Sequence, residues 1–223
     1  MAIGDKANHA AAFFDLDLTI TDRDSFRHFL KKHYFGKLGN WRFIPQIVLW
    51  GLLRKIRLIS LQTFKEKALV SLRGKDGSHI AKTGLHFFES HLKGIVRDKA
   101  LERIAWHKKR EHPVFIVTSC PDIYIRHLSE HLQCDGYECT KLAYRENDFT
   151  GAFDGKDCFG NEKVRRLKQL GIDVKFDLAK SYAYSDHESD LPLLECVGNP
   201  VAVTPTENLK KIAIERSWTI ENW

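Results

Sequence analysis

The feature of this sequence that most constrains its fold is an alternation of short apolar segments with helical patterns, which begins near residue 96. Apolar segments of strand length lie at residues 113–119, 181–185 and 201–203. Helical patterns lie between and beside them, at residues 96–109, 122–132, 162–170, 190–196 and 207–216. Strands that alternate with helices predict an α/β fold, in which helices cover both faces of a parallel, Rossmann-like sheet.

The first 92 residues add one more strand and a long helical segment to this plan. Residues 10–14 are apolar and end abruptly at polar residues, as a buried strand does where it opens into a loop. Helical patterns then continue to residue 92, and a hairpin is predicted later in the chain, from residues 137–144 and 149–153. We therefore expect residues 1–24 and 93–223 to form the core domain, and residues 25–92 to form an inserted helical cap.

Two broad classes of protein are excluded by composition. The 223-residue chain has five cysteines, an odd number without a Cys-x-x-Cys pair, which favours reduced cysteines in an intracellular protein over a disulfide scaffold. Its longest nearly apolar run, residues 43–53, is shorter than the roughly 20 residues that a membrane-spanning helix needs. Since the first 12 residues also lack the apolar region of a signal peptide, we expect a cytoplasmic protein.

Two carboxylates, Asp15 and Asp17, follow the first predicted strand, and Thr19 comes two residues later. In an open α/β sheet, ligands bind at the edge where the strands end, so both carboxylates are candidates for chemistry. Crowded carboxylates resist joint ionisation unless a cation lies between them, which makes a divalent metal a natural partner. The alternative is that the two residues only form a turn or cap a helix.

Three further polar groups lie in comparable places. Thr118 and Ser119 end the strand at 113–119 and precede a helix, where they would hold an anion or simply cap that helix. Lys163 begins a helix, a position that the helix dipole disfavours for a cation, so an external anionic partner is one interpretation and a solvated lysine the other. Asp186 and Asp190 follow the strand at 181–185, where they would hold a cation or cap the next helix.

In this order and spacing, the four groups resemble the four motifs of the haloacid dehalogenase-like phosphatase superfamily. The resemblance extends over nearly the whole chain, from Phe13 to Ile220. The helical insertion resembles the C1 cap of the subfamily that includes phosphoserine phosphatase. The phrases at residues 13–17, 118–121 and 184–194 look closest to its IB branch, which also includes phosphatidylglycerophosphatase C.

The resemblance implies a Mg²⁺-dependent phosphomonoester hydrolase that works through an aspartyl-phosphate. Asp15 would attack the phosphoryl group, and Asp17 would protonate the leaving alcohol and later deprotonate the attacking water. The phosphate would be bound by Thr118, Ser119 and Lys163. The metal would be held by Asp15, Asp186 and the main-chain carbonyl of Asp17, with Asp190 acting through water or as a support.

The sequence departs from the family pattern at two positions. Leu18 stands where the family commonly has glycine, and a bulkier residue there would alter the entry to the site. Ser185 stands where glycine often precedes the aspartate of the last motif. Neither change removes a reacting group, so the catalytic interpretation holds, with an inactive scaffold protein as the alternative.

Other candidate motifs give weaker evidence of a function. His127 and His131 have a spacing typical of zinc ligands, but without a third ligand nearby they are interpreted as surface histidines. The chain has neither a P-loop nor a Gly-x-Gly-x-x-Gly loop. Phosphorylated receiver modules also have an acid-lined parallel sheet, but they lack a helical cap.

The net charge of +6 is concentrated in one stretch of the predicted cap. Residues 23–58 contain nine basic residues and one acid, whereas the rest of the chain has 26 basic and 28 acidic residues. A uniformly basic nucleic-acid coat is therefore not expected, although a nucleic-acid-binding module that uses this stretch is an alternative.

Apolar residues, including Trp41, Trp50 and Leu49, are interleaved with these cations. One interpretation is a cap helix that buries its apolar residues against its neighbours. The other is an element that touches an anionic membrane peripherally. Because relatives with a similarly hydrophobic cap look like phosphatidylglycerophosphatase C, the second interpretation implies a lipid-headgroup phosphate such as phosphatidylglycerophosphate as substrate. A soluble phosphatase of small metabolites such as phosphoserine is the alternative.

Overall fold

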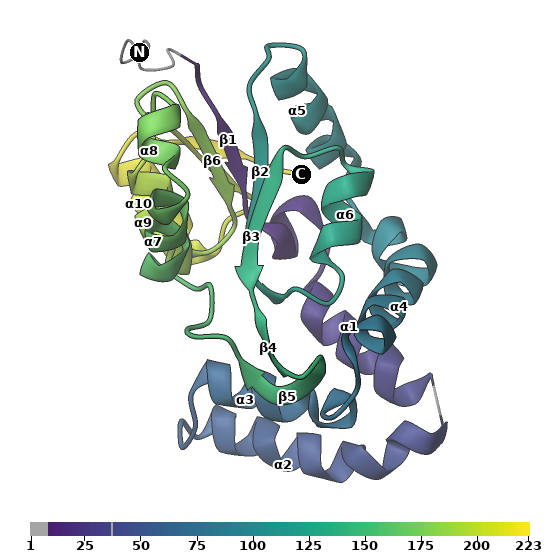
Figure 1. Cartoon of the computed structure of the whole chain (residues 1–223). Coiled ribbons are helices and arrows are strands. Elements are labelled where there is room, and N and C mark those ends of the chain that lie inside the picture. The colour runs from purple at the N-terminus through teal and green to yellow at the C-terminus, as the bar shows by residue number, and fades with distance from the viewer. Residues whose placement is uncertain (1–8, 37) are drawn as a thin grey trace.

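The computed structural model describes residues 9–36 and 38–223 of the chain. Its centre is a six-stranded sheet, in the order β3-β2-β1-β6-β7-β8, in which every neighbouring pair is parallel (Figure 1). The strands are β1 (Ala12–Phe14), β2 (Val114–Pro121), β3 (Gly136–Thr140), β6 (Tyr182–Ser185), β7 (Asn199–Val203) and β8 (Thr219–Glu221). A separate antiparallel ribbon is formed by β4 (Leu142–Arg145) and β5 (Asp148–Phe153).

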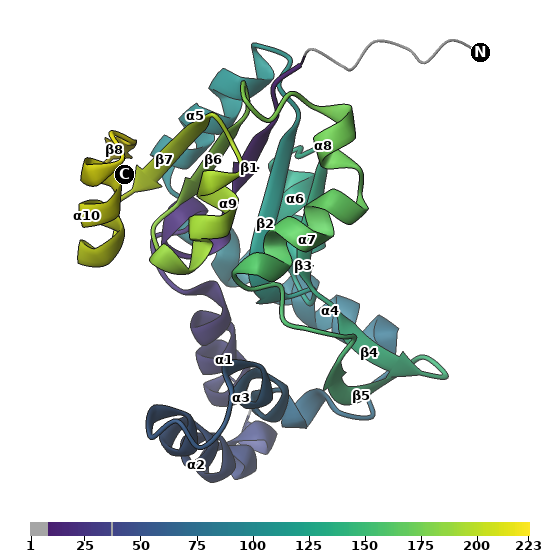
Figure 2. The same cartoon turned by 90° about the vertical axis from the view of Figure 1, so that its left-hand side faces the viewer.

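Helices cover both faces of the sheet, as the alternation of patterns predicts. One face is covered by α5 (Asp98–Lys108) and α6 (Ile125–His131). The other is covered by α7 (Asn161–Gln169), α8 (Ile172–Lys175), α9 (Leu191–Glu195) and α10 (Glu207–Glu215), which Figure 2 shows with α7 to α9 in front of the sheet. Because successive strand residues point to opposite faces, Phe14 belongs to the first hydrophobic core and Phe13 to the second. The predicted α/β fold is confirmed.

The remaining helices lie beyond the carboxyl ends of the strands (Figure 1). They are α1 (Ser25–Phe35), α2 (Ile44–Lys55), α3 (Leu61–Ala68) and α4 (Gly77–Phe87), joined by the short helical turns Leu38–Phe43, Val70–Leu72, Phe88–Leu92 and Lys93–Ile95. The two ends of this segment meet, since Thr21 and Val96 form an antiparallel bridge. Such closely spaced ends are what an insertion into a domain requires.

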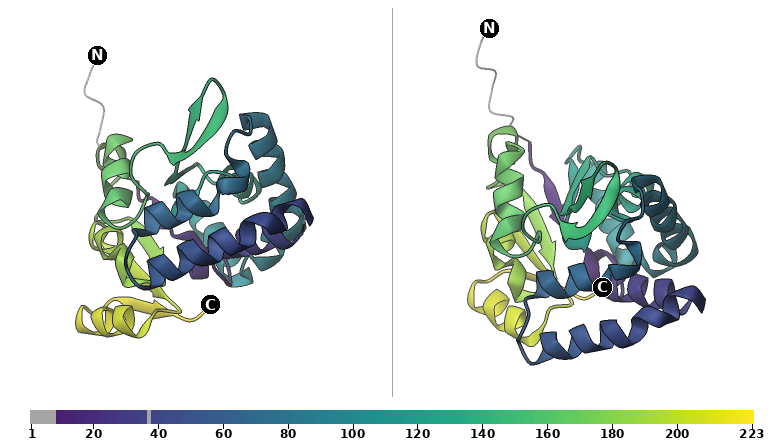
Figure 3. Two further views of the ribbon diagram at one scale, coloured as in Figure 1. Left: turned by 90° about the horizontal axis from the view of Figure 1, so that it is seen from below. Right: turned by 60° about the horizontal axis from the view of Figure 1, so that its bottom comes forward.

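Helix α2 is the outermost element at this end, packed beside α3 (Figure 3). Helix α4 packs closely against the core domain, because Gly84 has no side chain. A Cβ atom at Gly84 would lie 1.7 Å from the main-chain oxygen of Ile123. Glycine at this position therefore lets α4 pack against the connection between β2 and α6.

One sequence prediction was wrong about the hairpin. Residues 137–144 do not form one strand, because β3 pairs with β2 in the main sheet and the hairpin strand β4 begins only at Leu142. The two strands differ in burial. Cys139 and Thr140 at the end of β3 are fully buried, whereas Tyr144 in β4 is 43% exposed. Strand β8 was not predicted. Residues 1–8 of the predicted core and Lys37 of the basic stretch lie outside the described residues.

The cysteines and the helix lengths agree with the composition. Each of the five cysteines is free, and Cys120, Cys139 and Cys158 are buried. Among residues 9–36 and 38–223, no helix has the length and apolar character needed to cross a membrane.

Candidate active site

The site lies where three neighbouring strands end. The register places Phe14 of β1 beside Ile116 of β2 and Tyr184 of β6. Asp15, the residue after β1, therefore lies between Thr118, in the second half of β2, and Asp186, the residue after β6. Each of these three residues is at most 8% exposed. The central strand and its two neighbours thus bring together residues that are far apart in the sequence. The prediction that Thr118 and Ser119 end their strand was wrong by two residues, since β2 continues to Pro121.

A buried lysine joins two of the predicted carboxylates. The Nζ of Lys163, in the first turn of α7, donates to Oδ1 of Asp15 at 2.6 Å and to Oδ2 of Asp190 at 2.7 Å. Ser185 adds a hydroxyl that donates to Oδ2 of Asp190 at 2.8 Å. Lys163 is 2% exposed, so the interpretation of a solvated lysine was wrong, and its partners here are carboxylates of the protein itself.

The carboxylates of this cluster outnumber its cation. Burial raises the pKa of Asp15, and the neighbouring carboxylates raise it further, while Lys163 opposes the change. Burial likewise raises the pKa of Asp186 to about 6. Burial alone would lower the pKa of Lys163, but Asp15 and Asp190 more than offset it, and the pKa is raised. Three carboxylates around one ammonium leave a net negative site, which a divalent cation would neutralise.

The donor atoms available here fit Mg²⁺. Oδ1 of Asp190 is buried without a hydrogen-bond partner among the described residues, and the other carboxylates also offer oxygen, the ligand atom that Mg²⁺ prefers. No group of three or more His, Cys, Asp or Glu side chains in the described ranges could hold a metal by itself. A metal here would therefore need main-chain oxygen or water among its ligands as well as carboxylates.

Asp17 points to a different set of partners. Its Oδ1 accepts from the main-chain N–H of Ser25 at 2.7 Å, and its Oδ2 accepts from Sγ of Cys120 at 3.2 Å. Burial and the nearby Asp24 raise the pKa of Asp17. Leu18, which follows it, has a left-handed backbone (φ 60°) that glycine adopts more easily, and its side chain is 41% exposed. The position where the family commonly has glycine is thus strained here and open to solvent.

The two residues predicted to bind phosphate differ in their surroundings. Thr118 is 1% exposed, and its Oγ1 accepts from the main-chain N–H of Cys120 at 3.1 Å. The main-chain oxygen of Ser119 accepts from Lys65 Nζ at 2.7 Å and lies 3.0 Å from Oγ1 of Thr140. A threonine closer to the first carboxylates, Thr19, is fully buried and its Oγ1 lacks a partner among the described residues.

Sequence reasoning missed the link between the helical insertion and the core. Lys65 of α3 is 5% exposed, and its Nζ donates to Oδ2 of Asp157 at 2.9 Å as well as to Ser119. Thr140 donates to the other oxygen of Asp157 at 2.6 Å. The signal was present, because Lys65 lies on the helix face of Ala68 and Leu72, where a cation must find a partner.

The two histidines with zinc-like spacing do not belong to the site. The rings of His127 and His131 pack around Phe88 instead, with centroids 6.2 Å and 5.4 Å from it. His131 is exposed and His127 is half-buried, so the interpretation as surface histidines holds for His131 and in part for His127.

Comparison with known proteins decides the family. Residues 12–195 match the sequence pattern of the haloacid dehalogenase-like hydrolases, and this match covers most of the chain. The chain belongs to the haloacid dehalogenase-like hydrolase family. It is therefore an enzyme of the hydrolase class.

Similar proteins in this family include phosphatases. Phosphoserine phosphatase SerB1 of Mycobacterium tuberculosis is 27% identical over 218 residues, which cover 96% of this chain and 71% of that protein. A probable phosphatase of the same strain is also 27% identical, with 94% of this chain and 74% of that protein covered. Among solved structures, a Bordetella pertussis protein of unknown function has a TM-score of 0.86 at 23% identity, covering 96% of this chain and 99% of its own. A phosphoserine phosphatase with a phospho-aspartyl intermediate analogue has a TM-score of 0.65 at 19% identity, covering 96% and 93%, so it shares the fold.

Proposed function

We propose that this hydrolase is a Mg²⁺-dependent phosphomonoester phosphatase that forms an aspartyl-phosphate on Asp15. The observation that carries the proposal is the buried Lys163, which touches Asp15 and Asp190 together. A carboxylate that attacks an anionic phosphate needs positive charge close by, and this lysine supplies it in a site from which water is largely excluded. Residues 25–92 act as the cap over this site.

The reaction proceeds in two displacements. In the first, a carboxylate oxygen of Asp15 forms a bond to phosphorus while the bond to the leaving oxygen breaks, and Asp17 gives that oxygen a proton. In the second, water attacks the phosphorus and gives a proton back to Asp17, and the bond to Asp15 breaks. Thr118 and Ser119 bind phosphoryl oxygens, and Lys163 offsets their charge.

Asp15, Asp186 and the main-chain oxygen of Asp17 would hold the metal, with Asp190 behind them. The unpartnered Oδ1 of Asp190 and the excess of buried carboxylates support this assignment. When bound, Mg²⁺ supplies positive charge that stabilises the transferring phosphoryl group. The protein side chains then have the tasks of orienting Asp15 and moving the proton at Asp17.

Metal removal tests this proposal directly. We expect phosphate release from a panel that includes p-nitrophenyl phosphate and phosphoserine to require Mg²⁺ and to fall by at least about 100-fold in EDTA, because the loss of a metal removes several kcal/mol of charge stabilisation. Adding Mg²⁺ in excess of the chelator should restore the rate. Release that continues unchanged in EDTA, or no release with Mg²⁺ on any phosphomonoester, contradicts the proposal.

The substrate class is inferred from the outer face of α2. This helix has no buried residue, and its Val48, Leu49 and Leu52 side chains are each more than half exposed. Ile56, just beyond its end, is 63% exposed, and the spacing of these four residues places them on one side. An apolar stripe of this kind on the surface indicates an interaction site.

Cations at both ends of α2 indicate what covers this stripe. Arg42 precedes the helix, Arg54 and Lys55 form its last turn, and Arg57 follows it. A helix with an apolar face and flanking cations binds in the plane of an anionic lipid surface. We therefore propose that the phosphatase acts on a lipid-headgroup phosphate, such as phosphatidylglycerophosphate. The names of the similar proteins favour the second candidate, a soluble phosphatase of small metabolites such as phosphoserine.

Charge placed on the α2 stripe distinguishes the two candidates. Leu49→Glu together with Leu52→Glu should weaken binding to vesicles that contain phosphatidylglycerol by at least about tenfold, because burying each leucine contributes about 1.5–3 kcal/mol. Turnover of phosphatidylglycerophosphate in those vesicles should fall in parallel, while kcat/KM on p-nitrophenyl phosphate in solution stays unchanged. The measurements are vesicle cosedimentation and phosphate release.

The matched control changes two equally exposed apolar residues outside the insertion, Val174→Glu with Ile214→Glu. This variant should bind vesicles as the wild type does. If the wild type ignores the vesicles and hydrolyses phosphoserine efficiently, the soluble candidate is correct.

A further inference from the structure

The carboxyl group of Asp17 is held from both sides by residues to which the family resemblance assigns no role. On one side is the N–H of Ser25, the first residue of α1. On the other side is the thiol of Cys120, 3.2 Å from Oδ2. Neither group was singled out by the sequence as a contact of Asp17, and Cys120 lies 103 residues further along the chain.

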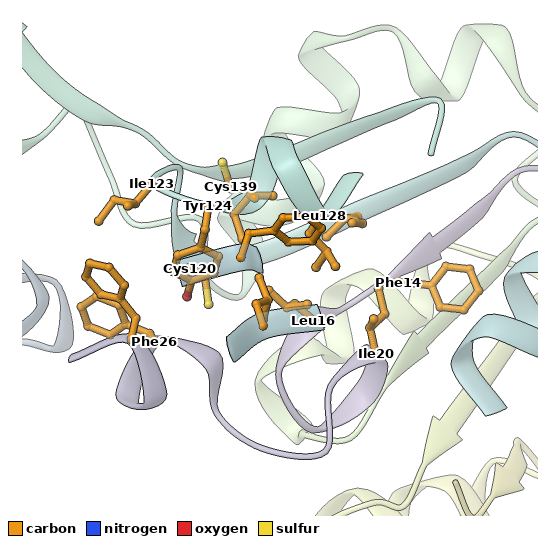
Figure 4. Close-up of a cluster of buried hydrophobic side chains, with 14 of the residues drawn as sticks. Phe14, Leu16, Ile20, Phe26, Cys120, Ile123, Tyr124, Leu128 and Cys139 are labelled. Carbon is orange, nitrogen blue, oxygen red and sulfur yellow. The ribbon is translucent and has the colours of Figure 1, made fainter. Parts of the chain in front are cut away.

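Behind Cys120, the hydrogen-bonded chain continues to two buried hydroxyls. The Oγ of Ser25 lies 3.4 Å from Sγ of Cys120 and 3.0 Å from the hydroxyl of Tyr124. Figure 4 shows Cys120 and Tyr124 side by side within the hydrophobic cluster. Ser25, Cys120 and Tyr124 are each at most 1% exposed, so water is not available to replace these contacts.

The arrangement has one consistent direction of donation. Cys120 is 1% exposed and lies against a carboxylate, so its thiol is an S–H group with a single hydrogen to give. The carboxylate of Asp17 accepts that hydrogen. Ser25 can then donate to the sulfur, and Tyr124 to Ser25, which provides each buried hydroxyl with an acceptor. All three hydrogens point along the chain toward Asp17.

We propose that Cys120 is a positioning residue, whose thiol, supported by Ser25 and Tyr124, fixes the orientation of the Asp17 carboxyl group toward the leaving oxygen. The inference rests on the proposed function, in which Asp17 transfers a proton. With Oδ2 held by Cys120 and Oδ1 by the N–H of Ser25, the plane of the carboxyl group is set by two elements at once. Orientation matters because general acid catalysis requires the proton to lie within hydrogen-bond reach of the oxygen that receives it.

The proposal can be tested with two substrates whose leaving groups differ in their need for a proton. p-Nitrophenolate leaves without much help from an acid, whereas the alkoxide of glycerol 2-phosphate needs a proton as its bond to phosphorus breaks. Cys120→Ala should therefore lower kcat/KM about tenfold or more on glycerol 2-phosphate and by no more than about threefold on p-nitrophenyl phosphate. Cys120→Ser should stay within about threefold of the wild type on both, because its hydroxyl donates in the same place.

Two other variants serve as controls for a general effect of removing a buried thiol and for misfolding of Cys120→Ala. Cys139→Ala removes an equally buried thiol far from Asp17 in the hydrogen-bond network and should leave both substrates unaffected. Tyr124→Phe keeps the ring and removes the last hydroxyl of the chain, so it should lower the glycerol 2-phosphate rate several-fold with little effect on p-nitrophenyl phosphate. It serves as the test if Cys120→Ala does not fold.

Equal losses on the two substrates in Cys120→Ala, or failure of serine to restore the rate, would overturn the inference and assign Cys120 to packing alone. A wild-type enzyme that hydrolyses neither ester in the presence of Mg²⁺ would instead overturn the proposed function, and the inference with it. The wild-type rates and the variant ratios therefore report the two failures separately.

Discussion

Replacing Asp15 with asparagine is expected to lower kcat for phosphomonoester hydrolysis by at least about 10³-fold, because the neutral amide is not a nucleophile toward phosphorus. The change is nearly isosteric, and the amide oxygen still accepts a hydrogen bond from Lys163. It removes one of three crowded carboxylates, so the folded state should not suffer from it. The measurement is phosphate release with Mg²⁺, together with the melting temperature of each protein.

A covalent readout separates this role from simple metal binding. Wild-type enzyme quenched in acid during turnover of a ³²P-labelled substrate should retain label, and Asp15→Asn should retain none. Asp173→Asn, which changes an exposed carboxylate of α8, is the matched control and should behave as the wild type. A variant at Asp15 that keeps more than about a tenth of the activity would exclude it as the nucleophile, and inactivity of the wild type would favour the scaffold alternative.

The placement of the motif residues could be predicted because it depends on topology alone. Parallel strands that alternate with helices have their carboxyl ends on one edge, so polar residues that follow strands must meet there. Asp15 and Asp186 follow β1 and β6, and Thr118 lies in the second half of β2, and these three strands are neighbours in the sheet. The contact between Lys163 and Asp15 spans 148 residues, and only the family resemblance, in which this lysine offsets the charge of the first aspartate, implied it.

Contacts that depend on how the insertion packs could not be read from the sequence. The pair of Lys65 and Asp157 joins α3 to a loop 92 residues later, and only the packing of the insertion against the core brings them together. The same holds for Cys120 and Asp17. When a contact depends on tertiary packing, the local sequence can indicate that a residue needs a partner, but it does not indicate which residue that partner is.

The two interpretations of the basic apolar stretch predict different burial for the apolar residues of α2. A cap helix that hides its apolar residues would have a buried face, but α2 has no buried residue. Trp50 and Leu53 are half-buried toward α3, whereas Leu49 and Leu52 are exposed. The amphipathic interpretation therefore accounts for one side of the helix, while the apolar side chains of the other side stay more than half exposed.

Replacing Lys163 with methionine is expected to have the second large effect, on both activity and stability. The ammonium is 2% exposed and bridges Asp15 and Asp190, so its loss leaves two buried carboxylates without their cation. Removing one partner of such a buried ion pair costs about 3–5 kcal/mol of unfolding free energy. In a chain of this length that corresponds to a melting temperature lower by about 10 °C, and loss of the charge opposite the phosphate should lower kcat about 10²–10³-fold.

The pH dependence of the loss in melting temperature identifies the cause of that loss. Burial already raises the pKa of Asp15 above its ordinary value, and loss of Lys163, which lowers it, would raise it further. An acid with a raised pKa in the folded state binds protons there that the unfolded chain does not, so the folded variant gains stability relative to the unfolded chain as pH falls. The difference in melting temperature between Lys163→Met and wild type should therefore shrink on acidification. A deficit that is constant with pH would indicate lost packing instead.

The matched control for this prediction is Lys168→Met, which removes an exposed lysine from the same helix. It should change the unfolding free energy by no more than about 0.5 kcal/mol and leave kcat unaffected, because a solvated surface lysine contributes little. If Lys163→Met behaves like Lys168→Met in both measurements, the lysine is not the partner of Asp15 in solution. The charge balance from which we infer the metal and the nucleophile would then fail together, since one ammonium among three carboxylates is its basis.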